Sequence, residues 1–178
     1  MMKNITLANF CVLLCSICVG FGATLLAQGN TQNTTAQPMS KVTSMSNRAA
    51  GTFEVKLNPQ ALHEKIETAT IGRMSIDKKF LGDLVATSKG EMLSAMTSTK
   101  GSAGYVAIES VTGILNGRKG GFVLQHSGTM NRSTPTLIVS VVPDSGTGEL
   151  VGITGNMTID IADGKHAYVF EYTFAEVR

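Results

Sequence analysis

Glu109 and His126 are the residues whose types are best suited to chemistry. A carboxylate beside an imidazole in a low-dielectric interior can favour the charged histidine, or hold one tautomer ready for proton transfer. Two interpretations remain open. Either the two side chains satisfy each other's hydrogen-bonding groups inside a packed core, or they contact a ligand or substrate.

Two stretches of alternating residues, 103–115 and 121–130, carry this pair and are joined by a glycine-rich turn at 117–120. We expect them to form an antiparallel hairpin in which Glu109 and His126 are diagonal neighbours on the more apolar face. The predicted partners are Leu115 with Phe122, Gly113 with Leu124, Val111 with His126, Glu109 with Gly128, Ala107 with Met130 and Tyr105 with Arg132.

Three further residues are candidate ligand contacts. Tyr105 and Arg132 lie near one end of the predicted hairpin, where a hydrogen bond or a cation contact is expected. Glu91 is harder to place because the turn at 98–102 closes in two registers. One register puts Glu91 beside Glu109, which would raise a carboxylate pKa, and the other puts Glu91 outside.

A second hairpin contributes aromatic side chains. Asp163-Gly164 suits a two-residue turn with positive φ at both positions. This turn sets Ile161 opposite His166, Ile159 opposite Tyr168, Met157 opposite Phe170 and Gly155 opposite Tyr172. A slip of one residue would exchange the two faces, so the pattern predicts that Tyr168, Phe170 and Tyr172 point inward as a ligand-contacting wall.

Metal, cofactor and nucleic-acid chemistry are not predicted. The three histidines are far apart and lack metal-ligand spacing. Gly146-Thr147-Gly148 joins two predicted antiparallel strands instead of opening a helix, so it is a turn and not a phosphate loop. Residues 51–178 hold twelve Lys and Arg against thirteen Asp and Glu with no basic cluster, which argues against nucleic acid.

The first 50 residues differ from the rest. Residues 1–27 combine Lys3 with a long apolar run and are typical of an export signal, which predicts a periplasmic or secreted protein. All three cysteines lie in this segment, so cleavage would leave no thiol. Residues 5–26 are also long enough to remain as a membrane anchor. Residues 28–50 are polar and predict a disordered linker.

Residues 51–178 are expected to form one all-β domain. Short connections rich in Gly, Asp, Asn and Pro are typical of a meander, and closing the last strand onto the first removes exposed edges. Only residues 60–68 could make a helical turn. The predicted strands are 52–57, 71–78, 83–96, 103–115, 121–130, 136–142, 150–161 and 165–173.

Five runs of the domain resemble the bacterial family called domain of unknown function 3224. They are IGRMSID at 71–77, TSKGEMLS at 87–94, GSAGYVAIE at 101–109, GFVLQHSGTMNR at 121–132 and VPDSGTGELVG at 142–152. The resemblance implies a closed eight-stranded antiparallel meander barrel related to the allene oxide cyclase fold. It supplies no reaction, and no motif here matches the cyclase site residue by residue.

The sequence therefore predicts an exported, cofactor-free barrel that binds a small apolar or amphipathic ligand. One alternative is a lyase or isomerase of allene oxide cyclase type, in which His126 and Glu109 exchange protons and Tyr105 or Arg132 steadies negative charge. Another is a structural barrel whose outer face forms homo-oligomers. Membrane contact is expected only if residues 5–26 are retained.

Overall fold

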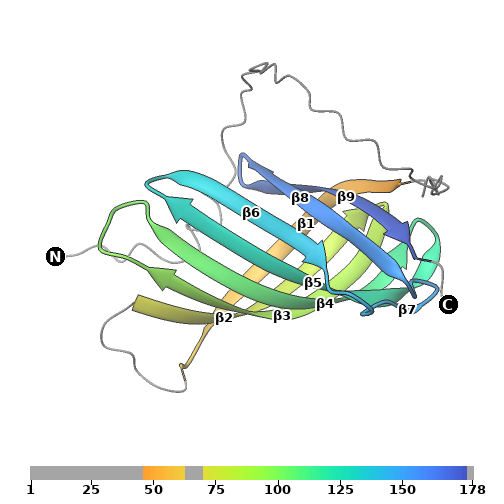
Figure 1. Cartoon of the computed structure of the whole chain (residues 1–178), viewed down its shortest axis with the longest axis horizontal. Helices are drawn as coiled ribbons and strands as arrows, with labels where there is room; N and C mark the ends of the chain where they lie inside the picture. The colour runs from red at the N-terminus through yellow and green to blue at the C-terminus, as the bar shows by residue number, and fades with distance from the viewer. Residues whose placement is uncertain (1–45, 63–69, 176–178) are drawn as a thin grey trace, which may run out of the picture.

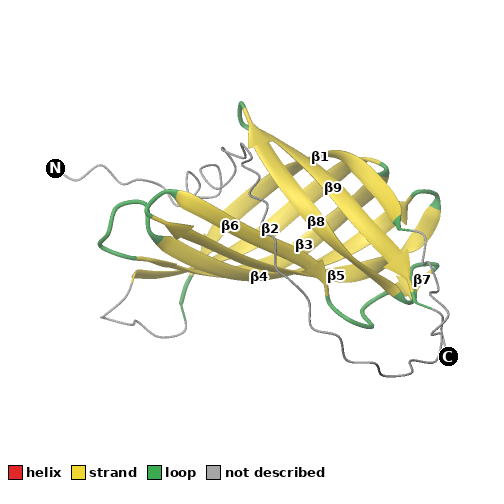
Figure 2. Cartoon of the chain, turned by 45° about the horizontal axis from the view of Figure 1, so that its top comes forward, coloured by secondary structure: helices red, strands yellow, loops and turns green. Residues whose placement is uncertain are grey.

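The computed structural model describes residues 46–62 and 70–175, which form β-strands, turns and short loops (Figure 2). Nothing in these residues is a helix long and apolar enough to cross a membrane. The strands are β1 (Asn47–Gln60), β2 (Thr70–Gly82), β3 (Leu84–Met96), β4 (Ala103–Leu115), β5 (Arg118–Asn131), β6 (Thr134–Val141), β7 (Thr147–Gly148), β8 (Ile153–Ala162) and β9 (Lys165–Phe174).

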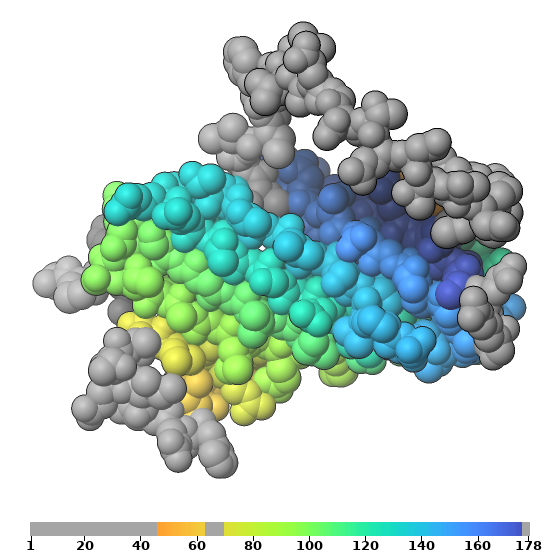
Figure 3. Space-filling view, in the orientation of Figure 1, coloured from red at the N-terminus to blue at the C-terminus, as the bar shows by residue number. Residues whose placement is uncertain are grey.

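The sheet closes into a barrel, as the sequence predicts. Each long strand pairs antiparallel with the next, and β9 pairs with β1 to complete a ring of eight strands (Figure 1). The two-residue β7 is an addition that pairs only with the start of β5. The seam between β6 and β8 is the most sparsely paired, with one register pair, Ser140 with Asn156. On the face that the space-filling view shows, the side chains of neighbouring strands lie against one another (Figure 3).

One half of the barrel interior, toward β7, is filled with side chains and is called the packed half below. The ring of Phe170 stacks on Phe122 at 5.5 Å and on Tyr172 at 5.1 Å. The loop after β6 covers this end, with Leu150 only 1% exposed. The Ser145 hydroxyl holds that loop by accepting a hydrogen bond from the Val123 amide at 3.0 Å.

The β8–β9 hairpin has the predicted register. Asp163 and Gly164 both adopt positive φ, at 50° and 74°, so they form the expected two-residue turn. All four predicted pairs, from Ile161 opposite His166 to Gly155 opposite Tyr172, are confirmed.

The predicted register of the β4–β5 hairpin is wrong by four residues. The turn consists of Asn116 and Gly117, with φ of 46° and 85°, and the glycines at 120 and 121 lie inside β5. Glu109 therefore lies opposite Leu124, and His126 opposite Ala107. Because the shift is even, every side chain keeps its predicted face, and Glu109 and His126 remain diagonal neighbours.

Several boundaries also differ from the prediction. Residues 47–50, assigned to the linker, are the start of β1, where Ala49 is fully buried opposite Phe170. Gln60 ends β1, so it does not begin a helical turn, and 63–69 lie outside the described residues. Residues 150–152 form a turn before β8. The predicted export segment, and the linker as far as residue 45, also lie outside the described residues.

Replacing Phe170 with Ala should destabilise the protein strongly because Phe170 is fully buried in the packed half. We expect a loss of roughly 3–5 kcal/mol, the usual cost of such a truncation in a core. Urea unfolding measures it. The control is Glu171→Ala at the exposed neighbouring position, expected within about 0.5 kcal/mol of wild type. Equal effects of the two substitutions would contradict this assignment of the core.

Candidate ligand site

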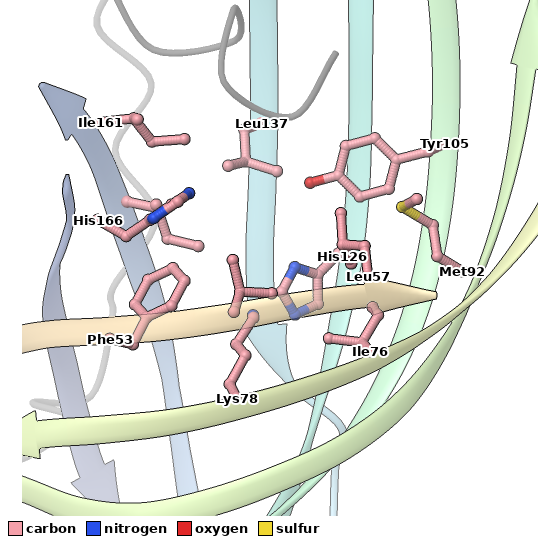
Figure 4. Close-up of a pocket in the computed structure, with 12 residues that line it drawn as sticks. Phe53, Leu57, Ile76, Lys78, Met92, Tyr105, His126, Leu137, Ile161 and His166 are labelled. Carbon is pink, nitrogen blue, oxygen red and sulfur yellow. The ribbon is translucent and has the colours of Figure 1, made fainter. Parts of the chain in front are cut away.

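The other half of the barrel contains a cavity of about 60 Å³ and is called the cavity half below. Figure 4 shows the lining side chains converging on this space. Four of them carry polar groups, namely Lys78, Tyr105, His126 and His166. The others are apolar and come mainly from β1, β2, β6 and β8, so any polar group brought into the cavity would meet only a few partners.

Glu109 contacts two of the lining residues, Lys78 and His126, and is the centre of a buried polar cluster. Its side chain is fully buried. One carboxylate oxygen, Oε2, accepts a hydrogen bond from Lys78 Nζ at 2.6 Å, and the other, Oε1, accepts one from Ser88 Oγ at 2.5 Å. Three strands, β2, β3 and β4, supply these groups. The carboxylate is therefore held in one orientation.

His126 approaches the same carboxylate from β5. Its Nε2 lies 3.2 Å from Glu109 Oε2. The direction between the two atoms is poor for a hydrogen bond, so buried Nε2 has no hydrogen-bond partner among the described residues. The contact is therefore electrostatic in this geometry.

The pKa values in the cluster follow from burial and charge. Burial would raise the pKa of Glu109, but the Lys78 ammonium and the contacts with His126 outweigh it and lower the pKa from 4.5 to about 2. Burial lowers the pKa of His126 below its usual 6.5; attraction to Glu109 opposes this shift, whereas Lys78 adds to it. The cluster at neutral pH is thus an ion pair beside a neutral imidazole.

The surroundings of His126 select its tautomer. A neutral imidazole carries one proton, and a lone pair on Nε2 would face the negative Oε2, so the proton is favoured on Nε2. Nδ1 then carries the lone pair. In Figure 4 one ring nitrogen of His126 is turned toward Lys78 and the other toward the cavity. The cavity therefore receives a hydrogen-bond acceptor from His126.

Lys78 and His166 complete the polar lining. Lys78 Nζ lies 4.9 Å from the Phe53 ring centre and 5.8 Å from that of Phe80, so aromatic faces contribute to holding the ammonium. His166 is half-buried with its ring 4.9 Å from Phe53. Burial, followed by repulsion from Lys78, lowers the pKa of His166.

Of the other predicted site residues, Tyr105 lines the cavity, but it does not face Arg132. Its ring covers Gly128, where an added Cβ would lie 2.3 Å from Tyr105 Cε1. Arg132 is exposed in the β5–β6 turn with φ of 47°, because the four-residue register change moves it beyond the hairpin. The predicted Tyr105–Arg132 pairing is therefore wrong.

Glu91 lies on the outer face of the barrel. Of the two predicted registers, the structure has the one that pairs Glu91 with Ile108 and Gly90 with Glu109. The Glu91 carboxylate accepts a hydrogen bond from Arg73 Nε at 2.9 Å, and both side chains are about half exposed. Glu91 therefore does not reach the interior.

The aromatic wall points inward as predicted but lies in the packed half instead of lining the cavity. The Tyr168 hydroxyl accepts a hydrogen bond from the Leu84 amide at 3.0 Å and donates to Leu81 O at 3.3 Å. Tyr172 accepts a hydrogen bond from Asn116 Nδ2 at 2.9 Å, and Phe170 is fully buried between its neighbours. These contacts are internal to the fold.

The sequence places His166 correctly opposite Ile161, but it does not identify His166, Lys78 or Ser88 as residues of the site. The signal for Lys78 was present, because alternation that turns Met74 and Ile76 inward turns Lys78 inward as well. Ser88 follows the same rule on β3. A lysine is normally assigned to solvent, which hides this signal.

Fold and site together define a small antiparallel barrel with a partly polar cavity in one half and a filled core in the other. Residues 49–172 match the family described as Protein of unknown function (DUF3224), so the chain belongs to the DUF3224 family. It is similar to the crystal structure of a DUF3224 protein of unknown function from Shewanella oneidensis MR-1, with 49% identity and a TM-score of 0.71. That match covers 75% of this chain and 100% of the other. No curated protein matches.

The lowered pKa of Glu109 predicts a specific acid sensitivity. Because its folded pKa of about 2 lies below the ordinary 4.5, its stabilisation is complete above pH 4.5 and is lost as pH falls toward 2. Between these two pH values the free energy of unfolding should fall by about 3 kcal/mol. Urea unfolding at several pH values should show this loss in the wild type and not in Glu109→Gln.

Glu109→Gln should also destabilise the protein at pH 7, by roughly 3–5 kcal/mol, because the Lys78 charge stays buried without its partner. The matched control is Glu91→Gln, whose ion pair is half exposed and is expected to contribute less than about 1 kcal/mol. An identical acid slope in wild type and Glu109→Gln would contradict the proposed ionisation of Glu109.

Proposed function

We propose that this protein binds a small amphipathic molecule in the cavity half of the barrel. The observation that carries the proposal is the presence of Lys78 and His126 in the lining of an otherwise mostly apolar cavity. Apolar walls with a few convergent polar groups are the usual composition of a ligand site. The cavity itself adds support, since the interior of a purely structural barrel could be filled by side chains along its whole length.

The size of the cavity limits the part of the ligand that enters. A volume of about 60 Å³ is far below the several hundred Å³ that hold a drug-sized molecule. It accommodates a small polar head group. The rest of the molecule would extend toward the barrel end along apolar side chains such as Leu57 and Leu137.

The charge balance of the cavity favours a neutral head group. Lys78 is already neutralised by Glu109 at 2.6 Å, and the imidazole of His126 is neutral. A ligand carboxylate would add an uncompensated charge to a buried site, at a cost of several kcal/mol. A carbonyl or hydroxyl group avoids this cost and can still form hydrogen bonds. The Glu109–His126 contact also favours a second candidate, a lyase or isomerase that works by proton transfer.

Blocking the cavity should abolish ligand uptake. The probe is 2-hexanone, which joins a small carbonyl head to a short apolar tail, titrated while NMR follows the methyl groups of Ile76, Ile159 and Ile161. Leu137 lines the cavity, so Leu137→Trp should remove the saturable shifts. Ile138, the next residue, is 59% exposed on the outer face, so Ile138→Trp should bind like the wild type. Absence of binding by the wild type, together with recovery of only ligand-free protein from the natural host in native mass spectrometry, would contradict the proposal.

We further propose that the protein acts outside the cytoplasm, on the basis of its N-terminal sequence. Protein purified from the periplasm or medium of the source bacterium should begin near Gln28 when its N-terminus is sequenced. Intact Met1 in the membrane fraction would instead support an anchor at residues 5–26. Intact Met1 on soluble protein would contradict both expectations.

A further inference from the structure

We infer that the cavity is a proton-transfer site, in which His126 Nδ1 removes a proton from the carbon next to a ketone carbonyl. This inference rests on the proposed binding of a small amphipathic molecule and adds a reaction to it. Its basis is the orientation of His126 between a fixed carboxylate on one side and the cavity on the other.

The first element is a base with its lone pair in the cavity. Glu109 lies 3.2 Å from Nε2 and favours the proton there, which leaves Nδ1 as the acceptor. A carboxylate that holds an imidazole in one tautomer is the arrangement that makes histidine an effective general base. His126 is 3% exposed, so bulk water does not compete freely for Nδ1.

The second element is a positive group for the charge that develops. Lys78 lines the same cavity, and its Nζ contacts the same Glu109 oxygen that His126 approaches. Base and ammonium are thus anchored to one atom. Removing a proton beside a carbonyl moves negative charge onto the carbonyl oxygen and positive charge onto His126, so the net charge of the site does not change. The preorganised Lys78 ammonium, although paired with Glu109, stabilises the charge on the oxygen in this low-dielectric site. This requirement points to ketones as the substrate class.

The step balances without a co-reactant. The C–H bond breaks and its proton bonds to Nδ1, while the electron pair forms a carbon–carbon double bond and the carbonyl electrons move to oxygen as an enolate. The imidazolium formed lies beside the Glu109 carboxylate, which stabilises its charge. Return of the proton to the same carbon gives exchange, and return to the far end of a conjugated system gives isomerisation.

The residues have distinct roles. His126 is the catalytic residue, since it touches the reacting proton. Glu109 is a positioning residue, which orients the imidazole and is itself held by Ser88 Oγ and Lys78 Nζ. His166 and Tyr105 are the other titratable groups that line the cavity.

Hydrogen–deuterium exchange of 2-hexanone tests the inference. The full-length protein in D₂O should accelerate loss of the C1 and C3 proton signals in ¹H NMR, and His126→Gln should slow the catalysed exchange by about 10²-fold or more. Glu109→Gln should slow it at least about tenfold and alter its pH profile. Glu91→Gln, the same substitution on the outer face, should match the wild type.

The pH profile of exchange separates a base from a merely structural residue. Catalysed exchange should rise with pH through the lowered pKa of His126, below 6.5, and then level off, because only the neutral imidazole accepts a proton. The pKa of Glu109 is lowered to about 2, so its carboxylate stays charged across that range and does not shape the rise. Leu137→Trp retains His126 and Glu109 but should abolish exchange by excluding the ketone, which keeps the test valid if His126→Gln folds poorly.

Each of the other possible results would overturn a specific part of the proposal. Saturable binding of 2-hexanone without exchange would overturn proton transfer and leave the binding function standing. Failure to bind would overturn the binding function itself. Exchange that His126→Gln does not slow would remove His126 from the reaction. A covalent adduct on Lys78 after treatment with cyanoborohydride would show an iminium route through the lysine and overturn the role of His126.

Discussion

The ion pair between Lys78 and Glu109 is the constraint around which the cavity half is organised. Two opposite charges at 2.6 Å are almost fully removed from water, an arrangement that survives only with close geometry and additional hydrogen bonds. Ser88 on β3, the ring of Phe53 on β1 and the ring of Phe80 on β2 supply that support. The position of the pair in turn determines how His126 is charged and which of its nitrogens faces the cavity.

The barrel divides stability and chemistry along its axis. The packed half contains the stacked aromatic rings and most of the fully buried side chains, so most of the apolar burial that drives folding occurs there. The smaller apolar cluster around Met74, Ile76 and Met92 lies beside the cavity. A charged cluster that is costly to remove from water can be kept in one half because the other half supplies the apolar core.

Sequence predicted the barrel and the facing of side chains well because both follow from a period of two. Asp163-Gly164 allowed only one tight turn, so its register was confirmed. The glycines from 117 to 121 permit two turn positions, and the predicted one is wrong. Because the register differs by four residues, an even number, the Glu109–His126 contact is preserved. Alternation indicates which side faces inward but not the depth along the barrel axis. For that reason the pattern predicts a pocket wall at Tyr168 and Phe170, although these side chains fill the core.

The sparsely paired seam between β6 and β8 gives the wall an uneven mechanical strength. Along the other joints of the ring, many consecutive residue pairs would have to separate together, whereas β6 and β8 share only the pair Ser140 with Asn156. Leu137 and Ile159, one from each strand of this seam, both line the cavity. Opening the wall at this seam would break the fewest backbone hydrogen bonds, and the seam lies beside the space that a ligand would occupy. A ligand that entered through the side of the barrel here would require no movement of the packed half.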